Sequence, residues 1–416
     1  MISEKKIVKS AIHELEFLII GLILLFSNVA LYFISGLAVR YAALLMGVLF
    51  IFYAAFKRSK KNISKAYPIF VTTIVYFFIL AFISIFQNHV ISNDVTKQIF
   101  SLIALGCFFS GYLLATSKIN FVGNFYSWKV RLITAITIFG LIGFLRYYEG
   151  ISFYGTMRGY GELSGLNPVG IAFSFSSLFV IYFALIVFSS KIYDKLLYGT
   201  AMLFTGAIII TTASRGAIMW ASLSIIFFVL SARIRSINWG KLFLIGIVGL
   251  VFATGASFLF GDNVILAESL GILMKRFEGM FGLVGTNTTA ALDLSASARL
   301  EYWIHYTSNI PDWLLFGEKN YVGYPHNQFL EIMVRFGLFG IPLLGFSLYI
   351  FSKFLNLFLI KKSYKDLEIT IICLVFLFSY LSSLSSLSLE VNRGLWLGLG
   401  YFWGYLAVNR RHIALK

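Results

Sequence analysis

Residues 168–189 have the sequence PVGIAFSFSSLFVIYFALIVFS, which contains no charged side chain. Because about 20 consecutive apolar residues span the hydrocarbon core of a bilayer as a helix, this stretch predicts a transmembrane helix. Comparable apolar runs recur along the whole chain of 416 residues. Together they predict twelve transmembrane helices, at 17–35, 41–56, 69–86, 98–116, 130–147, 168–189, 196–212, 217–232, 242–260, 328–351, 368–386 and 394–408.

The composition is that of a protein whose surface mostly faces lipid. Apolar residues make up 59% of the chain and charged residues 12%, whereas soluble proteins carry about 25% charged residues. These values exclude a soluble enzyme with one anchor, and the length of the apolar runs excludes a β-barrel. We therefore expect an all-α polytopic membrane protein, in which residues 1–416 form a single membrane domain with no soluble domain appended.

The basic residues indicate the orientation of the helices. The formal net charge is +16, from 34 Lys and Arg against 18 Asp and Glu. If the N-terminus lies in the cytoplasm, 23 of the 34 basic residues fall in inner loops, as the positive-inside rule requires. The excess of positive charge is then explained by topology and not by a nucleic-acid partner. Both termini are predicted to be cytoplasmic.

Arginine dominates the smaller set of basic residues on the predicted outer side. Eight of the 11 outer cations are Arg, whereas 17 of the 23 inner cations are Lys. Orientation needs only positive charge, but a planar guanidinium binds phosphate or carboxylate through two parallel hydrogen bonds. The bias favours anion binding on the outer face, with structural pairing of these Arg residues as the alternative.

Two outer segments in the first half of the chain carry candidate residues. The loop at 146–168 is rich in Gly and Tyr and contains Arg158, a candidate substrate-binding residue. A short hairpin between the seventh and eighth predicted helices contains Ser214-Arg215-Gly216. A charge at this depth usually faces the bundle interior or a wet cavity, which makes Arg215 a candidate catalytic residue. Snorkelling of Arg215 to the interface is the alternative.

The one long loop, at 261–327, is predicted to lie on the outer side and to form part of the active site, because long loops in compact proteins are usually functional. Arg276, in a helix-like run near its start, is a candidate substrate-binding residue. Arg299 and Trp303 are four residues apart, so a helix would place them on one face. They fit either a wall for a sugar diphosphate or a cation–π packing pair.

The long loop ends at Tyr324-Pro325-His326-Asn327, where Pro325 predicts the start of a helix. His326 would then lie beside free backbone N–H groups and the positive end of the helix dipole. That setting lowers the pKa of a His and favours the neutral imidazole that a general base needs. A cap or another structural hydrogen bond is the alternative role for His326.

Glu331 and Arg335 follow His326 with the spacing of a helix salt bridge. Glu331 is also the second candidate for the general base, or for a group that orients a neighbour. The other outer histidines, His89 and His305, have no comparable setting, and we expect no functional role for them.

The order of these motifs resembles the O-antigen ligase and O-antigen polymerase superfamily. The resemblance covers roughly residues 165–350, and the first 140 residues match only in hydropathy. The residues that carry it are Asn167-Pro168, Ser214-Arg215-Gly216, Ala298-Arg299 with Trp303, Leu315-Phe316-Gly317, His326-Asn327 with Leu330-Glu331, and Phe336-Gly337-Leu338-Phe339-Gly340.

This resemblance implies a bacterial inner-membrane glycosyltransferase of GT-C-like architecture whose active site faces the periplasm. The implied donor is a glycan carried on undecaprenyl diphosphate, and neither a metal ion nor another cofactor is expected. The expected catalytic residues are His326, Arg215 and Arg299; the expected substrate-binding residues are Arg158, Arg276, Trp303, Asn327, Glu331 and Arg335. Besides the lipid bilayer, a chain-length regulator and a flippase are candidate partners.

The favoured reaction is polymerisation of lipid-linked repeat units, and the alternative is ligation of the finished polymer to the lipid A core. The Arg-x10-Gly motif associated with some polymerases is absent at Arg158, Arg215 and Arg299, so both stay open. A transporter or flippase would show inverted repeats and polar breaks near the bilayer midplane, and the sequence shows neither. A glycosyltransferase of the shape and division type would need a decisive outer Asp, which has no matching context here.

Overall fold

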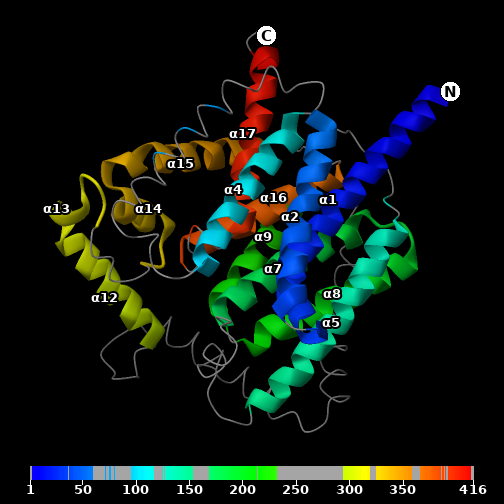
Figure 1. The fold of residues 1–416 in the computed structure, drawn as a ribbon, viewed down its shortest axis with the longest axis horizontal. Helices are drawn as coiled ribbons and strands as arrows, with labels where there is room; N and C mark the ends of the chain where they lie inside the picture. The colour runs from blue at the N-terminus through cyan, green and yellow to red at the C-terminus, as the bar shows by residue number, and fades with distance from the viewer. Residues whose placement is uncertain are drawn as a thin grey trace. The chain divides into compact units, whose positions relative to one another are not determined.

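The computed structural model describes residues 2–35, 37–59, 95–116, 127–152, 168–212, 214–231, 294–318, 325–357, 366–385 and 392–413, with single positions at 71, 75, 79, 125, 387 and 389. Every regular element in these ranges is a helix (Figure 1). The helices are α1 (Ile2–Ser35), α2 (Leu37–Ser59), α4 (Val95–Thr116), α5 (Trp128–Ser152), α7 (Pro168–Phe188), α8 (Ile192–Thr211), α9 (Arg215–Ser231), α12 (Leu294–Ser308), α13 (Ile310–Trp313), α14 (Gln328–Phe336), the 3-10 helix η1 (Gly337–Gly340), α15 (Ile341–Leu355), α16 (Leu367–Ser383) and α17 (Arg393–Ile413).

Four helical segments in these ranges are long and apolar enough to cross a membrane: Ala38–Lys57, Trp128–Leu145, Gly170–Phe188 and Gln328–Leu355. The prediction of an all-α protein with transmembrane helices is confirmed at this level. Ten of the twelve predicted spans coincide with helices of the structure. The span at 242–260 lies outside the described residues, and that at 69–86 is described only at three helical positions. The number of crossings and the GT-C-like arrangement stay predictions.

The helices cluster into two compact units, each assembled from segments that are distant in the sequence. The first unit contains Met1–Phe50, Asn120–Thr286 and Lys362–Phe378, and the second contains Ile51–Ile119, Asn287–Lys361 and Ser379–Lys416. The first therefore holds α1, α5, α7, α8 and α9, the second holds α4, α12 to α15 and α17, and α2 and α16 are divided between them. That residues 1–416 form a single membrane domain stays a prediction.

Within the first unit, α1 and α5 pack side by side and run parallel. Near the start of α5, Lys129 Nζ lies 3.0 Å from Glu16 Oε2. Further along both helices, Gly140 lies against the carbonyl of Ala30. These two helices were predicted as the first and fifth crossings, which must run in the same direction, so the packing agrees with the predicted alternation.

The other helix directions in this unit follow the same alternation. α7 runs antiparallel to α5 and parallel to α9, as expected for a sixth crossing beside a fifth and an eighth. The contacts that fix these directions are Phe144 with Phe175, Tyr182 with Thr134, Ser176 with Ala217, and Phe183 with Phe228.

The basic ends of α5 and α8 meet in the same unit. Arg131 at the start of α5 forms an ion pair with Asp194 at the start of α8. Its guanidinium carbon also lies 4.5 Å from the centroid of the Tyr193 ring. The loops that precede α5 and α8 were both predicted to be on the inner side, and the ion pair places the starts of these two helices at the same end of the unit. Which side of the membrane this end faces stays a prediction.

In the second unit, α4 and α17 lie side by side and approach closely because glycine lines their contact (Figure 1). Gly400 lies against the carbonyl of Phe108, and Gly404 lies against that of Tyr112. The paired positions advance together, so the two helices are parallel. Gly400 and Gly404 are four residues apart, a spacing that lets transmembrane helix backbones come together.

The predicted crossing at 328–351 is not one continuous helix. α14 ends at Phe336, the 3-10 turn η1 follows, and α15 begins at Ile341 (Figure 1). The break occurs at Gly337, whose φ of 55° is accessible to glycine at little cost. At about 1.5 Å per residue, α14 alone is far too short to cross a bilayer. α14 is therefore a short helix that leads from the site residues into α15.

Substituting Gly400 tests the packing of α4 against α17. We expect Gly400→Ala to lower the free energy of unfolding by about 1–3 kcal/mol, because the new methyl group meets the backbone of Phe108 and the helices must separate. Gly199→Ala is the matched control, since a Cβ at Gly199 in α8 meets open space. Thermal unfolding of detergent-solubilised protein measures both. Equal unfolding temperatures for the two variants would contradict the close contact.

Candidate functional site

Helix α12 carries two of the predicted site residues, Arg299 and Trp303, on one face, as their spacing predicts. A small apolar core fixes this helix to its neighbours: Tyr306 of α12, Trp313 of α13 and Val334 of α14 are buried together. The indole Nε1 of Trp313 donates a hydrogen bond of 2.8 Å to the carbonyl oxygen of Tyr306. The three helices therefore form one packed group that can hold a site in a defined geometry.

Trp303 links α12 to the residues that precede α14. Its indole Nε1 donates a hydrogen bond of 2.6 Å to the carbonyl oxygen of Pro325. Because Pro325 directly precedes His326, this bond fixes the backbone at the histidine. Trp303 remains 40% exposed, so ring surface is left for contact with a ligand.

His326 has an unusual backbone and a shifted pKa. Its φ of 55° is the one positive value among the non-glycine residues of the described ranges, and such conformations concentrate at functional sites. Burial of the imidazole and, as the smaller cause, the nearby positive charge of Arg299 together lower its pKa to about 4. The imidazole is therefore neutral at pH 7, and Arg299 is close enough to act on it electrostatically.

The neutral form of His326 was predicted correctly, but its cause was not. The helix begins at Gln328, three residues after Pro325, and Asn327 is its N-cap. The Asn327 Oδ1 accepts hydrogen bonds from the backbone N–H groups of Phe329 and Leu330, at 2.9 and 3.2 Å. The first free N–H groups of α14 are thus occupied by Asn327. Burial and Arg299 lower the pKa of His326.

Asn327 and Glu331 also bind the segment between α16 and α17, which was not predicted to belong to the site. The Asn327 Nδ2 donates to the carbonyl oxygen of Leu384 at 3.3 Å. Glu331 Oε2 accepts from the backbone N–H of Leu389 at 3.1 Å, and its Oε1 accepts from Arg335 Nη1 at 3.1 Å. The predicted helix salt bridge is confirmed. With both oxygens engaged and the side chain buried, Glu331 has the geometry of a structural residue.

Two glycine turns bring together motifs that are twenty residues apart. Gly317 has a φ of 87°, and a Cβ there would overlap the carbonyl of Arg335. Around this contact, the N–H of Leu338 donates to the carbonyl of Leu314 at 2.8 Å. The rings of Phe316 and Phe339 stack with centroids 5.9 Å apart. The Leu315-Phe316-Gly317 and Phe336–Gly340 motifs are therefore one structural element, in which glycine permits close approach of two backbones.

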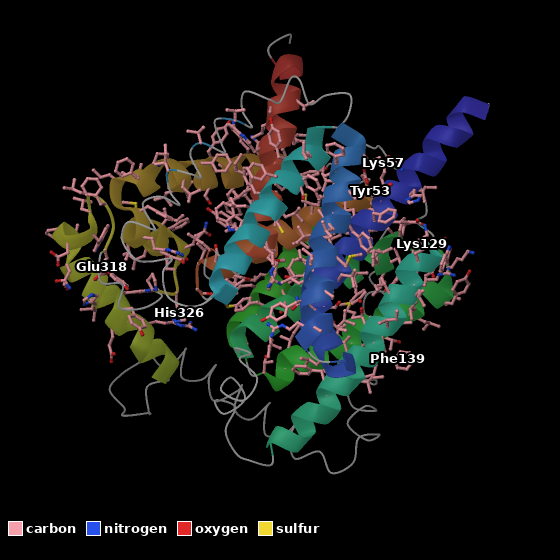
Figure 2. The ribbon with its side chains drawn as sticks, viewed as in Figure 1. Tyr53, Lys57, Lys129, Phe139, Glu318 and His326 are labelled. Atoms are coloured by element: carbon pink, nitrogen blue, oxygen red, sulfur yellow. The ribbon has the colours of Figure 1, made fainter. Side chains whose placement is uncertain are left out.

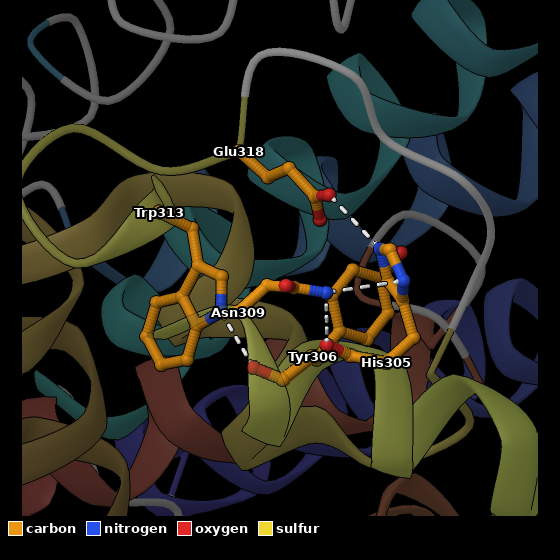
Figure 3. Close-up of polar contacts among 5 residues, drawn as sticks. All are labelled: His305, Tyr306, Asn309, Trp313 and Glu318. Atoms are coloured by element: carbon orange, nitrogen blue, oxygen red, sulfur yellow. Dashed lines mark hydrogen bonds and ion pairs between the residues drawn. The ribbon is translucent and has the colours of Figure 1, made fainter. Parts of the chain in front are cut away.

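His305 was predicted to have no functional role, and the structure places it in a polar cluster (Figure 3). Its Nε2 lies 3.2 Å from Glu318 Oε1, and its Nδ1 lies 3.4 Å from Asn309 Nδ2. The Asn309 Nδ2 also donates to the carbonyl oxygen of His305 at 2.8 Å. Sequence separation hid this cluster, because Glu318 is 13 residues from His305.

The structure does not place the remaining predicted site residues beside Arg299, Trp303 and His326. Arg158 and Arg276 lie outside the described ranges. Arg215 is the first residue of α9, where the N–H of Ile218 donates to the carbonyl of Ser214 at 3.2 Å. The preceding helix α8 ends at Thr211, four residues before Arg215, and the catalytic role of Arg215 stays a prediction. Among the residues that the structure describes, no three His, Cys, Asp or Glu side chains gather as a metal site would require.

No protein-family model matches the chain, and no curated protein matches it significantly. The resemblance to the O-antigen ligase and polymerase superfamily therefore rests on the quoted motifs alone.

The contacts of Glu331 predict that this residue has a structural role and not a catalytic one. Glu331→Ala should lower the free energy of unfolding by roughly 3 kcal/mol, because it removes the buried carboxylate that pairs with Arg335 and accepts from the backbone N–H of Leu389. Glu301→Ala, at an exposed position on α12, should change stability by less than about 0.5 kcal/mol. Thermal unfolding in detergent compares the two. A Glu331→Ala variant as stable as wild type would refute the structural role.

Proposed function

We propose that this protein is a periplasm-facing glycosyltransferase of the bacterial inner membrane that polymerises oligosaccharide units carried on undecaprenyl diphosphate. The observation that carries the proposal is the group formed by Arg299, Trp303 and His326. A fixed cation, an indole surface and a neutral imidazole are the groups that transfer from a sugar diphosphate needs. Both termini in the cytoplasm and a site on the periplasmic side are part of this proposal.

The reaction that fits these groups is displacement at the anomeric carbon. An acceptor hydroxyl oxygen attacks that carbon, and the bond from the carbon to the diphosphate oxygen breaks with its electron pair leaving on the diphosphate. Negative charge therefore grows on the leaving group, and a preorganised cation in a partly dry site stabilises it strongly. Arg299 supplies this charge in the described residues, and the catalytic role of Arg215 stays a prediction from the sequence.

The acceptor hydroxyl must lose a proton as its oxygen attacks. His326 is neutral at pH 7, so its imidazole can accept this proton. Attack by the acceptor on the face opposite the diphosphate inverts the anomeric configuration. Trp303 would contact an apolar face of a sugar ring, since part of its indole remains exposed.

Two other functions share parts of this proposal. A ligase would use the same donor and chemistry but transfer the polymer to a lipid A core, and the described residues hold nothing that separates the two acceptors. A transporter or flippase for lipid-linked glycan is the least favoured, because it needs no proton acceptor beside a fixed cation. A neutral, partly buried imidazole next to Arg299 favours chemistry over transport.

A deletion strain complemented with variants tests the function directly. Loss of a polymerase should leave a core that carries a single repeat unit, whereas loss of a ligase should leave a bare core and long chains on the lipid carrier. His326→Ala and Arg299→Ala should behave as the deletion does, at wild-type protein level in the membrane. Repeat units stranded in the cytoplasmic leaflet would show a flippase, and full complementation by both variants would refute the site.

The pH dependence of transfer follows from the lowered pKa of His326. The base works in its neutral form, so activity should persist as the pH falls through 6.5 and decline only near pH 4 to 5. Initial rates of glycan transfer by purified wild-type enzyme across pH 4 to 8 measure this acid limb. Arg299 disfavours the imidazolium, so Arg299→Gln should raise the pKa of His326, which exchange of the imidazole C2 hydrogen measures without activity. An acid limb at pH 6.5 in the wild type would contradict the buried imidazole.

A further inference from the structure

The residues on both sides of segment 319–324 are attached to the same helix. Upstream, the carboxylate of Glu318 contacts His305 of α12, with Oε1 and Nε2 3.2 Å apart. Downstream, the carbonyl of Pro325 accepts from Trp303 of α12 at 2.6 Å. His305 and Trp303 are two positions apart, and the next residue after Pro325 is His326. Figure 2 shows Glu318 and His326 both lying along α12.

The His305 ring is held in one orientation. An amide nitrogen only donates, so Asn309 Nδ2, at 3.4 Å, makes His305 Nδ1 the acceptor. In the neutral ring the proton is then on Nε2, which donates to Glu318 Oε1 (Figure 3). Asn309 makes no cap bond to α13, although it occupies the N-cap position. The Asn309 amide instead hydrogen-bonds to His305, and this bond orients the imidazole so that its Nε2 faces Glu318.

Glu318 is also held by its backbone, which contacts α14. Its backbone N–H donates to the carbonyl of Val334 in α14 at 2.7 Å, directly after the turn at Gly317. Glu318 is only 7% exposed. Burying a carboxylate to this degree costs free energy unless the carboxylate is hydrogen-bonded, so the contact with His305 offsets part of the cost of removing Glu318 from water. Its position depends on two helices, α12 and α14, at once.

We propose that Glu318 and His305 are positioning residues: Glu318 binds α12 through His305 and α14 through Val334, and this link holds the start of α14, where His326 lies, against α12 and so keeps the imidazole beside Arg299. They act through the fold and not on the substrate. That this placement serves glycosyl transfer rests on the proposed function; that it sets the environment of His326 rests on the contacts alone.

The variants that test this are Glu318→Ala and His305→Ala, with Glu318→Gln as the conservative change. Gln keeps an oxygen that accepts from His305 Nε2, so it should retain the placement and most of the activity. Loss of the contact should reduce kcat by about 10²-fold, the order expected for misplacing a catalytic group by about 1 Å. KM for the lipid-linked donor should change much less. Glu301→Ala is the control on the exposed side of α12.

A second readout does not depend on activity. Exchange of the imidazole C2 hydrogen, followed by mass spectrometry of the peptide that contains His326, gives its titration midpoint in the intact protein in detergent. The wild type, Glu318→Gln and Glu301→Ala should titrate near pH 4. Glu318→Ala, His305→Ala and the double variant should titrate closer to 6.5, all three alike, because the imidazole leaves its buried place beside Arg299.

The outcomes separate the two proposals. If Glu318→Ala and His305→Ala leave the midpoint of His326 at the wild-type value, the positioning role is overturned, whatever the protein catalyses. If Glu318→Gln abolishes transfer without moving that midpoint, Glu318 itself acts on the substrate and the positioning role is again overturned. If the midpoints move as expected but no glycan is transferred by the wild type, only the proposed function fails.

Discussion

A hydrocarbon environment offers the backbone no hydrogen-bond partner, so each N–H and C=O group within it must be satisfied inside a helix. Several hydroxyl groups of the described helices also bond to the backbone of their own helix: Ser177 donates to the carbonyl of Phe173, and Thr205 to that of Ala201. Helix interiors therefore have no backbone group to offer a ligand. Backbone groups that can bind a ligand occur where helices begin, end or break, and His326 and Asn327 lie at such a place, whereas Arg299 and Trp303 contribute side chains from within α12.

The same constraint explains why glycine recurs at contacts in both units. Helices in lipid gain little from the hydrophobic effect and associate by close packing. Gly140 lets α5 approach α1, and Gly400 lets α17 approach α4. Gly317 and Gly337 serve a different purpose, because their positive φ values let two turns interlock beside α14. Gly140 and Gly400 allow helices within the units to pack closely, whereas Gly317 and Gly337 allow the turns on either side of α14 that position the site residues.

Much of the fold could be predicted because hydropathy and helix-end signals are local. Pro168 opens α7 as expected, α9 begins two residues before the predicted span at 217–232, and the directions of packed helices follow the alternation set by counting apolar runs. The site was predictable in its parts, since Arg299 and Trp303 share a helical face. What could not be predicted depends on contacts between distant residues. The pairing of Glu318 with His305, and of Glu331 with Leu389, leaves no local pattern in the sequence.

The pairing of Arg299 with His326 has a consequence for the proposed reaction. A base with a pKa near 4 is fully available at pH 7 but weak, so on its own it gains little from accepting a proton. A diphosphate bound at Arg299 would offset the guanidinium charge and add negative charge beside the imidazole. Both effects raise the pKa of His326 toward the pH at which it works. The donor would thereby strengthen the base that its own transfer requires, and the empty site would hold a neutral but weak one.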